Sequence, residues 1–146
     1  MPDLNPVMNR HDLTDFFTRE FSQVNADGPH YTITEIGPGF ASMRLDPGDR
    51  HLRPGGTVSG PTLFTLADLA AYAVILAHIG PVALAVTTNL NINFLRKPGL
   101  GSVDATARLL KLGKRLAVVE ILMTQGGEGD LVAHATATYS IPPSSR

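Results

Sequence analysis

The sequence predicts an α+β fold in which a curved antiparallel β-sheet of about six strands wraps around one long central helix. Two features support this prediction. Residues 59–79 are apolar on every side of a helix, so this helix must be surrounded by other parts of the protein. Six segments with extended or alternating patterns flank it, and the four that follow it are joined by the short turns that antiparallel neighbours permit. The apolar helix is the element that can cover the apolar face of such a sheet.

The central helix has clear ends and one unusual residue. Ser59 can cap its N-terminus, Pro61 suits its first turn, and Gly80 followed by a proline ends it. Asp68 is the only charge before His78, and a buried carboxylate without partners is costly. We therefore expect Asp68 to be placed there for chemistry. The helix approaches the length that crosses a bilayer, but this charge and the strand-rich remainder favour a buried core helix and no membrane partner.

The elements before the central helix follow from spacing and turn residues. A first helix is predicted over residues 10–24, capped by Asn9. Extended patterns over residues 30–36 and 40–45 predict two strands. Residues 46–58 have no period and predict a long loop. We divide the chain into a lead-in and helix (1–29), a sheet-and-helix domain (30–141) and a frayed tail (142–146).

Four strands are predicted after the helix, over residues 82–94, 102–112, 115–125 and 131–141. The first alternates most cleanly and is predicted to be unusually long and half-buried. One face of it carries Val82, Leu84, Val86, Leu90, Ile92 and Phe94, and the other carries Ala83, Ala85, Thr87, Asn89, Asn91 and Asn93. A sheet of this kind around a central helix is the hotdog architecture.

Composition excludes several classes of function. A net charge of −1 and a pI near 6.5 give no indication of a nucleic-acid or anionic-membrane partner. The chain has no cysteine, which excludes disulfides, thiolate metal sites and a cysteine nucleophile. The histidines show no metal-ligand spacing, so no metal is expected. The first residues lack the apolar run of a secretory signal, and we expect a cytoplasmic protein.

Residues 51–68, HLRPGGTVSGPTLFTLAD, resemble the loop-and-helix signature of the PaaI-like hotdog acyl-CoA thioesterases, within the 4-hydroxybenzoyl-CoA thioesterase superfamily. His51, Gly56, Gly60 and Asp68 stand at the positions that the signature expects. Residues 91–115, NINFLRKPGLGSVDATARLLKLGKR, are similar to further features of the family, and the resemblance covers about residues 40–140. The chain departs from the signature at Arg53, Ser59 and Pro61, where the family has Asn, His and Gly.

The resemblance implies hydrolysis of a small or aryl acyl-CoA thioester, with coenzyme A as part of the substrate and no separate cofactor. It assigns the oxyanion contact to the N–H of Gly60, which lies at a helix N-terminus. It assigns Asp68 the role of general base or nucleophile and leaves that choice open. Thr87 aligns with a hydroxyl that positions water in some relatives. The candidates for contacts to the substrate or its phosphates are His51, Arg53, Ser59, Arg96 and Lys97.

Helix geometry adds a requirement for a second subunit. Eight residues of helix separate Gly60 from Asp68 by about 12 Å, which is too far for one thioester to contact both. A two-fold homodimer can bring Gly60 of one chain near Asp68 of the other, with two sites per dimer. The resemblance implies the same arrangement, often as a dimer of dimers. The polar row of Asn89, Asn91 and Asn93 suits such an interface.

Two other functions are compatible with the sequence. Because the family's Asn and His are replaced at Arg53 and Ser59, the chain could bind acyl-CoA without turnover. A hotdog hydratase or dehydratase would use a loop histidine such as His51. In those enzymes, however, the helix acid comes about five residues after the capping glycine, where this chain has Thr65. The acid at Asp68 favours the thioesterase.

Overall fold

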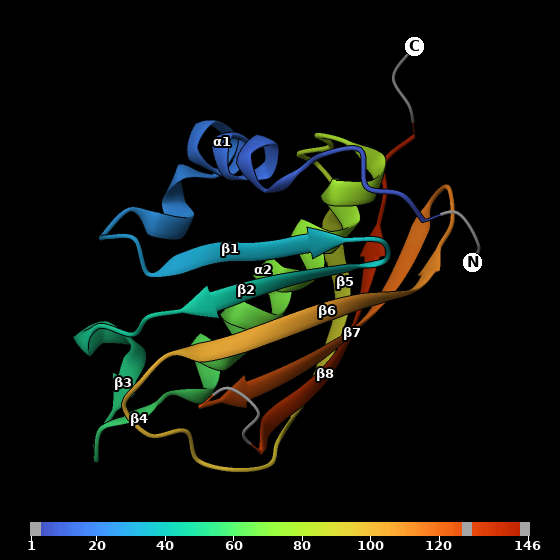
Figure 1. Cartoon of the computed structure of the whole chain (residues 1–146). Coiled ribbons are helices and arrows are strands. Elements are labelled where there is room, and N and C mark those ends of the chain that lie inside the picture. Colours follow the sequence, from blue (N-terminus) through green and yellow to red (C-terminus); the bar gives the residue numbers. More distant parts are fainter. Residues whose placement is uncertain (1–3, 127–129, 144–146) are drawn as a thin grey trace.

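The computed structural model describes residues 4–126 and 130–143 and shows a curved sheet that wraps around helix α2, Gly60–Ile79 (Figure 1). The strands are β1 (Tyr31–Gly37), β2 (Phe40–Leu45), β5 (Val86–Phe94), β6 (Val103–Leu112), β7 (Leu116–Gln125) and β8 (Leu131–Ser140). They form one antiparallel sheet in the order β1-β2-β6-β7-β8-β5. The predicted hotdog fold is confirmed. Parts of the predicted lead-in (1–3), tail (144–146) and last turn (127–129) lie outside the described residues.

Helix α2 begins and ends where the sequence predicts. The Ser59 hydroxyl accepts a hydrogen bond from the N–H of Thr62 at 3.3 Å, and Gly80 ends the helix with a φ of 98°, which suits glycine. Its apolar residues face the sheet, so 78% of the stretch long enough to cross a membrane is buried inside the protein. It is the core helix of the sheet.

Small side chains line both β8 and the buried surface of α2. The inner row of β8 consists of Ala133, Ala135, Ala137 and Tyr139, all 2% exposed or less. Helix α2 is also rich in buried alanine, at Ala67, Ala70, Ala71, Ala73 and Ala77. Alanine pairs bring backbones near each other, so a polar group on α2 at this level can reach groups on β8 and its neighbour β5.

Helix α1 (Arg10–Glu20) is shorter than the predicted helix over residues 10–24. Asn9 and Asp12 form a capping box at its start, and it ends because Phe21 leaves the helical conformation, with φ −138° and ψ 51°. A 3₁₀ turn, η1 (Ser22–Asn25), follows. The side chain of Asn25 bonds both the N–H and the C=O of Tyr31, at 2.9 and 2.8 Å, which fixes η1 to the start of β1.

The predicted loop over residues 46–58 is partly ordered into short elements. A 3₁₀ turn, η2 (Asp49–His51), leads into a two-stranded hairpin of β3 (Leu52–Arg53) and β4 (Thr57–Val58). The hairpin turn uses Gly55 and Gly56, whose φ values of 100° and 80° favour glycine. Short strands of two residues have no readable period, which is why the sequence predicted only a loop.

The predicted strand over residues 82–94 differs most from the structure. Strand β5 has nine residues, lies at the edge of the sheet and exposes much of its surface. Its register with β8 shifts between Thr87 and Asn89, which is a β-bulge. Beyond the bulge Leu90 pairs with Ala137, while before it Thr87 pairs with Tyr139. Directly paired residues share a face, so the predicted placement of Thr87 opposite Leu90 is wrong, and both face α2.

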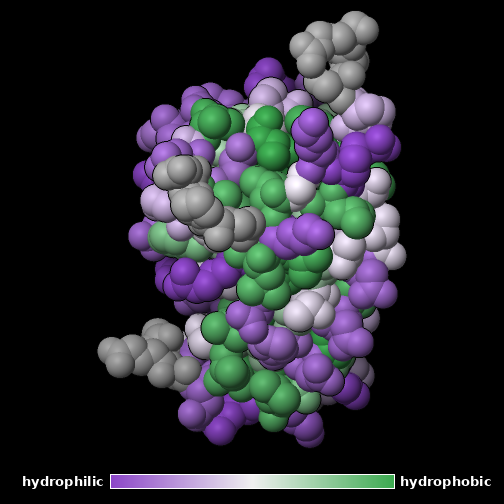
Figure 2. Space-filling view, turned by 90° about the vertical axis from the view of Figure 1, so that its right-hand side faces the viewer, coloured by the Kyte–Doolittle hydropathy of each residue, from purple (hydrophilic) through white to green (hydrophobic). Residues whose placement is uncertain are grey.

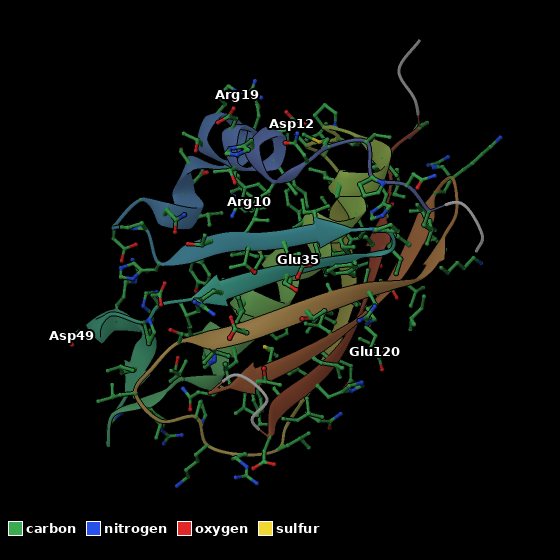
Figure 3. The ribbon with its side chains drawn as sticks, viewed as in Figure 1. Arg10, Asp12, Arg19, Glu35, Asp49 and Glu120 are labelled. Carbon is green, nitrogen blue, oxygen red and sulfur yellow. The ribbon has the colours of Figure 1, made fainter. Side chains whose placement is uncertain are left out.

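Charged and apolar groups share the surface. Arg10, Asp12 and Arg19 belong to α1, Asp49 lies in η2, and Glu35 and Glu120 are carried by β1 and β7 (Figure 3). Figure 2 shows hydrophobic side chains in a broken band down one side of the molecule, between hydrophilic margins. Several exposed large apolar side chains lie in or beside β5: Leu84, Val86, Phe94 and Leu95 are 53 to 76% exposed.

Candidate active site

Asp68 is held at the middle of α2 by two hydroxyl groups from the sheet. The Thr87 hydroxyl donates to Asp68 Oδ1 at 2.6 Å, and the Tyr139 hydroxyl donates to the same oxygen at 2.7 Å. Tyr139 also lies 3.1 Å from the main-chain carbonyl of Asp68. Among the described residues Oδ2 has no partner, and the side chain is half-buried. One carboxylate oxygen is therefore fixed and the other is left for water or substrate.

The bulge in β5 explains how Thr87 reaches the carboxylate. The extra residue at Thr88 shifts the alternation by one, so that Leu90, Ile92 and Phe94 share the inner face with Thr87. In a regular strand of the same sequence, with no bulge, Thr87 would lie on the same face as Asn89. Bulges often lie beside active sites because they redirect a side chain without ending the strand. The structure thus brings the predicted Thr87 and Asp68 together.

Tyr139 is a site residue that the sequence analysis missed. It is 2% exposed, and its burial, together with the negative charge of Asp68, raises the pKa of its phenol far above the ordinary value. The hydroxyl therefore stays protonated and acts as a donor. The available signal was a single tyrosine in the alternating row of alanines of residues 131–141, where a polar group needs a buried partner.

A cavity of about 490 Å³ opens beside the carboxylate. Its wall includes Asp68, Thr87 and Tyr139 together with the rings of Tyr72 and Phe21. The rings of Phe21 and Tyr72 meet edge to face at 5.8 Å. This volume is in the range of small-ligand sites, and its aromatic wall suits an apolar or aryl group next to the reacting centre.

The start of α2 faces a different cavity, of about 700 Å³. Gly60 lies in its wall together with Arg53, Arg96 and Lys97, so the structure brings these four predicted residues together. Within the described part of the chain, no group accepts the N–H of Gly60. A Cβ atom at position 60 would lie 3.3 Å from the Phe94 ring, so a larger residue here would have to displace that ring. The cavity combines a free helix N-terminus with positive charge, which suits an anionic ligand.

His51 and Ser59 lie apart from that basic cavity and have local partners. His51 Nδ1 accepts from the N–H of Gly48 at 2.9 Å, and its ring packs against His30 with centroids 4.7 Å apart. Burial and the nearby His30 lower the pKa of His51, so the ring is neutral with its proton on Nε2. Ser59 caps α2 and contacts the Thr62 hydroxyl at 2.8 Å. Both line a third cavity, of about 370 Å³.

The remaining histidines of interest have ordinary partners. His78 lies between the N–H of Gly39, 2.9 Å from Nε2, and the carbonyl of Val74, 2.7 Å from Nδ1. His134 contacts Glu120 at 2.9 Å on the outer face of the sheet. Across residues 4–126 and 130–143, no three histidine or acidic side chains are grouped closely enough to hold a metal.

Comparisons with known proteins agree with this fold and site. A protein of Silicibacter sp. TM1040 that has been assigned as a thioesterase is 45% identical, with a TM-score of 0.87 over 97% of each chain. The phenylacetic acid degradation protein PaaI of Thermus thermophilus, solved as a mutant, is 30% identical, with a TM-score of 0.66 over 77% of this chain and 93% of PaaI. Human acyl-coenzyme A thioesterase 13 is 28% identical over 73% of this chain and 76% of its own length. These neighbours define the class as a hotdog thioester hydrolase.

The family itself follows from a profile match. Residues 55–132 match the profile of the Thioesterase superfamily. This range covers more than half of the chain and includes Gly60, Asp68 and Thr87, though Tyr139 lies beyond it. The chain belongs to the thioesterase superfamily.

Proposed function

We propose that this protein hydrolyses a small or aryl acyl-CoA thioester to the free acid and coenzyme A, with Asp68 as the reacting carboxylate. The observation that carries the proposal is the pair of hydroxyl groups on Asp68 Oδ1, at 2.6 and 2.7 Å, which leaves Oδ2 available beside a cavity. Hydrogen bonds to an ionised group are the strong kind, and they hold the carboxylate in one orientation. Thr87 and Tyr139 therefore act as positioning residues.

Thioester hydrolysis also needs a donor for the carbonyl oxygen. The N–H of Gly60 is unused within the described chain, but it lies about 12 Å along the helix from Asp68 and faces another cavity. We infer that Gly60 of the partner subunit supplies this donor in a two-fold homodimer, which then has two sites. Because the residue after Gly60 is Pro61, only one main-chain donor is available at this helix start.

The edge strand β5 supports pairing of two copies along it. Among the described residues it is hydrogen-bonded only to β8, along one of its two sides. Beside it, Phe64 is 41% exposed, and Gly60, Pro61, Phe64, Ile92 and Phe94 line one apolar depression. An exposed edge with apolar neighbours is a surface that proteins cover. The outward row of Asn89, Asn91 and Asn93 would then be available for a dimer of dimers.

Coenzyme A would lie along the basic cavity at the start of α2. Arg53, Arg96 and Lys97 offer positive charge for its phosphates, although Arg96 is already 2.9 Å from Asp130. His51 and Ser59 line a different cavity and contribute through the shape of the loop before α2. The acyl group would occupy the aromatic cavity beside Asp68.

Two routes fit this geometry. As a general base, Asp68 Oδ2 takes a proton from water while the water oxygen bonds to the thioester carbon. Charge on the carbonyl oxygen is held by the Gly60 N–H until the C–S bond breaks and the thiolate leaves with a proton. As a nucleophile, Oδ2 bonds to the carbon itself and displaces the thiolate, and water then cleaves the mixed anhydride.

The test measures thiol release from a panel of aliphatic and aryl acyl-CoAs, with Asp68→Asn as the matched control because it keeps the shape and removes the charge. We expect the wild-type rate to exceed that of the variant by about 10²-fold or more. Equal rates across the panel would instead favour acyl-CoA binding without turnover. A single turnover in ¹⁸O-labelled water, with hydroxylamine to trap an acyl-enzyme, then separates the routes: a trapped acyl group or label in Asp68 indicates a nucleophile, and label in the acid with no trapped acyl group indicates a base.

A further inference from the structure

Two cavities lie on the same side of α2, and Phe21 stands between them. The near cavity contains Asp68 and the far cavity contains His51, and both include Phe21, Gln23 and Leu69 in their walls. Leu69 is adjacent to Asp68 in the chain, so the shared wall begins one residue from the carboxylate. The two spaces of about 490 and 370 Å³ are therefore neighbours, and Phe21 is the one aromatic side chain that lines both.

Phe21 is held at this position by the end of α1. It is the residue at which the helix ends, and its N–H still bonds the carbonyl of Phe17 at 2.9 Å. Its ring is half-buried and packs edge to face on Tyr72, with centroids 5.8 Å apart. On the other side of η1, Asn25 fixes the segment to Tyr31. The segment that covers both cavities is thus anchored at each end.

The far cavity can accept a chain of methylene groups. It extends from Leu69 to Thr62, which is seven residues or about 10 Å along the helix. The Thr65 hydroxyl already bonds the carbonyl of Pro61 at 3.1 Å, and that of Thr62 lies 3.4 Å from the carbonyl of His51. Arg50 and Asp27 also line this cavity and pair with each other at 3.1 Å. Because these hydroxyl and charged groups have partners, they would not be left unpaired beside an apolar chain.

We propose that Phe21 limits the length of the acyl group by closing the end of the near cavity. A longer acyl chain enters the far cavity only when the Phe21 side chain is absent. This inference rests on the proposed function, because it takes Asp68 as the point where the thioester carbon lies. The wild-type protein is therefore expected to prefer short or aryl acyl groups. The first helix, outside the segment that matches the family profile, determines this specificity.

The experiment compares wild type with Phe21→Ala and Phe21→Leu. For each, kcat/KM is measured on straight-chain acyl-CoAs from acetyl to dodecanoyl and on phenylacetyl-CoA. We expect Phe21→Ala to raise the ratio of long-chain to short-chain kcat/KM at least tenfold, and Phe21→Leu to raise it less. Phe16→Leu is the matched control, because Phe16 is 3% exposed on the same helix and lines neither cavity. It should leave the ratio unchanged even if it lowers stability.

A second readout does not depend on turnover. S-alkyl coenzyme A thioethers of increasing length are titrated calorimetrically into the same proteins, and Phe21→Ala should tighten the longer ones selectively. If no thioester is hydrolysed but the thioethers show this shift, the proposed function fails and the role of Phe21 stands. Suppose instead that wild type hydrolyses acyl-CoAs and that both Phe21 variants depend on acyl length in the same way as wild type. The role of Phe21 is then overturned, and the proposed function stands.

Discussion

The two functional positions of α2 differ in how much of their surroundings one chain supplies. At the middle of the helix, Asp68 receives two hydroxyl hydrogen bonds from β5 and β8 and lies beside an aromatic cavity. At its start, the N–H of Gly60 has no acceptor among the described residues and faces a basic cavity. The carboxylate is already oriented within the chain, whereas the amide still lacks the group that it would bind. Under the proposed function, one chain therefore completes one half of a site and offers the other half to a second copy.

Removing the Gly60 amide should have the largest effect. Gly60→Pro deletes the N–H, and its backbone conformation fits because Ser59 is extended, with ψ 154°, and proline suits the first helical position. Its Cβ would lie 3.3 Å from the Phe94 ring, so Gly60→Ala, which makes the same contact, is the matched control. We expect kcat to fall by about 10² to 10³, as for loss of an oxyanion donor. Gly60→Ala, which keeps the N–H, should lose far less.

The same variant tests whether the two halves come from different chains. Neither Gly60→Pro nor Asp68→Asn should be active alone, but subunit exchange between them forms heterodimers with one intact site. An equal mixture should recover about a quarter of wild-type activity if pairing is random. No recovery after verified exchange would mean that Gly60 and Asp68 do not act together across two chains. The inference that a second copy completes the site would then be wrong.

Removing a hydroxyl group that orients the Asp68 carboxylate should have an intermediate effect on kcat. Tyr139→Phe and Thr87→Val each remove one hydroxyl from Asp68 Oδ1, and hydrogen bonds to charged groups contribute about 1.5–3 kcal/mol. We expect kcat to fall about tenfold or more with KM little changed, because the carboxylate is misaligned but still present. Thr87→Ser should restore most of the rate. A change in KM alone would show that these hydroxyls contact substrate instead.

Removing charge from the basic cavity should have a smaller effect. Arg53→Ala, at an exposed position, is expected to raise KM about three- to tenfold with kcat unchanged, and to reduce the dependence of KM on salt. Arg50→Ala is the matched control, because Arg50 pairs with Asp27 and lines the far cavity. Equal effects of both variants would argue against a phosphate contact at Arg53.

The smallest expected effect is on the pH dependence of stability, through His51 in the loop that leads into α2. Folding lowers the pKa of His51 below the ordinary 6.5. As the pH falls through 6.5, the unfolded chain therefore binds more protons than the folded chain does, and the folded state loses stability. The melting temperature of His51→Gln should therefore decline less than that of wild type from about pH 7.5 to about pH 5. His11→Gln, at an exposed position of α1, should decline as wild type does. Parallel curves for all three proteins would contradict the assignment.

The sequence predicted the fold because its strongest patterns are long. The apolar stretch from Gly60 to Ile79 and the alternation of residues 103–109 needed no tertiary knowledge to interpret. Asp68 was evident for the same reason, as a charge in an apolar helix. The faces of β5 could not be predicted, because one extra residue at Thr88 reverses the alternation and its sequence looks regular. Tyr139 was missed because its role depends on a contact with a residue 71 positions away.

The bulge at Thr88 also affects which single-residue deletions β5 can accept without turning side chains to the other face. Deleting that one residue would remove the bulge and leave Thr87 and Leu90 on the inner face, because Asn89 would then follow Thr87 in regular alternation. Deleting a residue in the regular part of the strand, such as Asn91, would instead turn one part of β5 to the opposite face. A deletion in the Pro98–Gly101 connection shifts no side chain from one face to the other, because this connection lies outside the strands. Among natural relatives and designed variants, losses of single residues should therefore occur in such connections and at Thr88, and be rare in the regular part of β5 from Leu90 to Phe94.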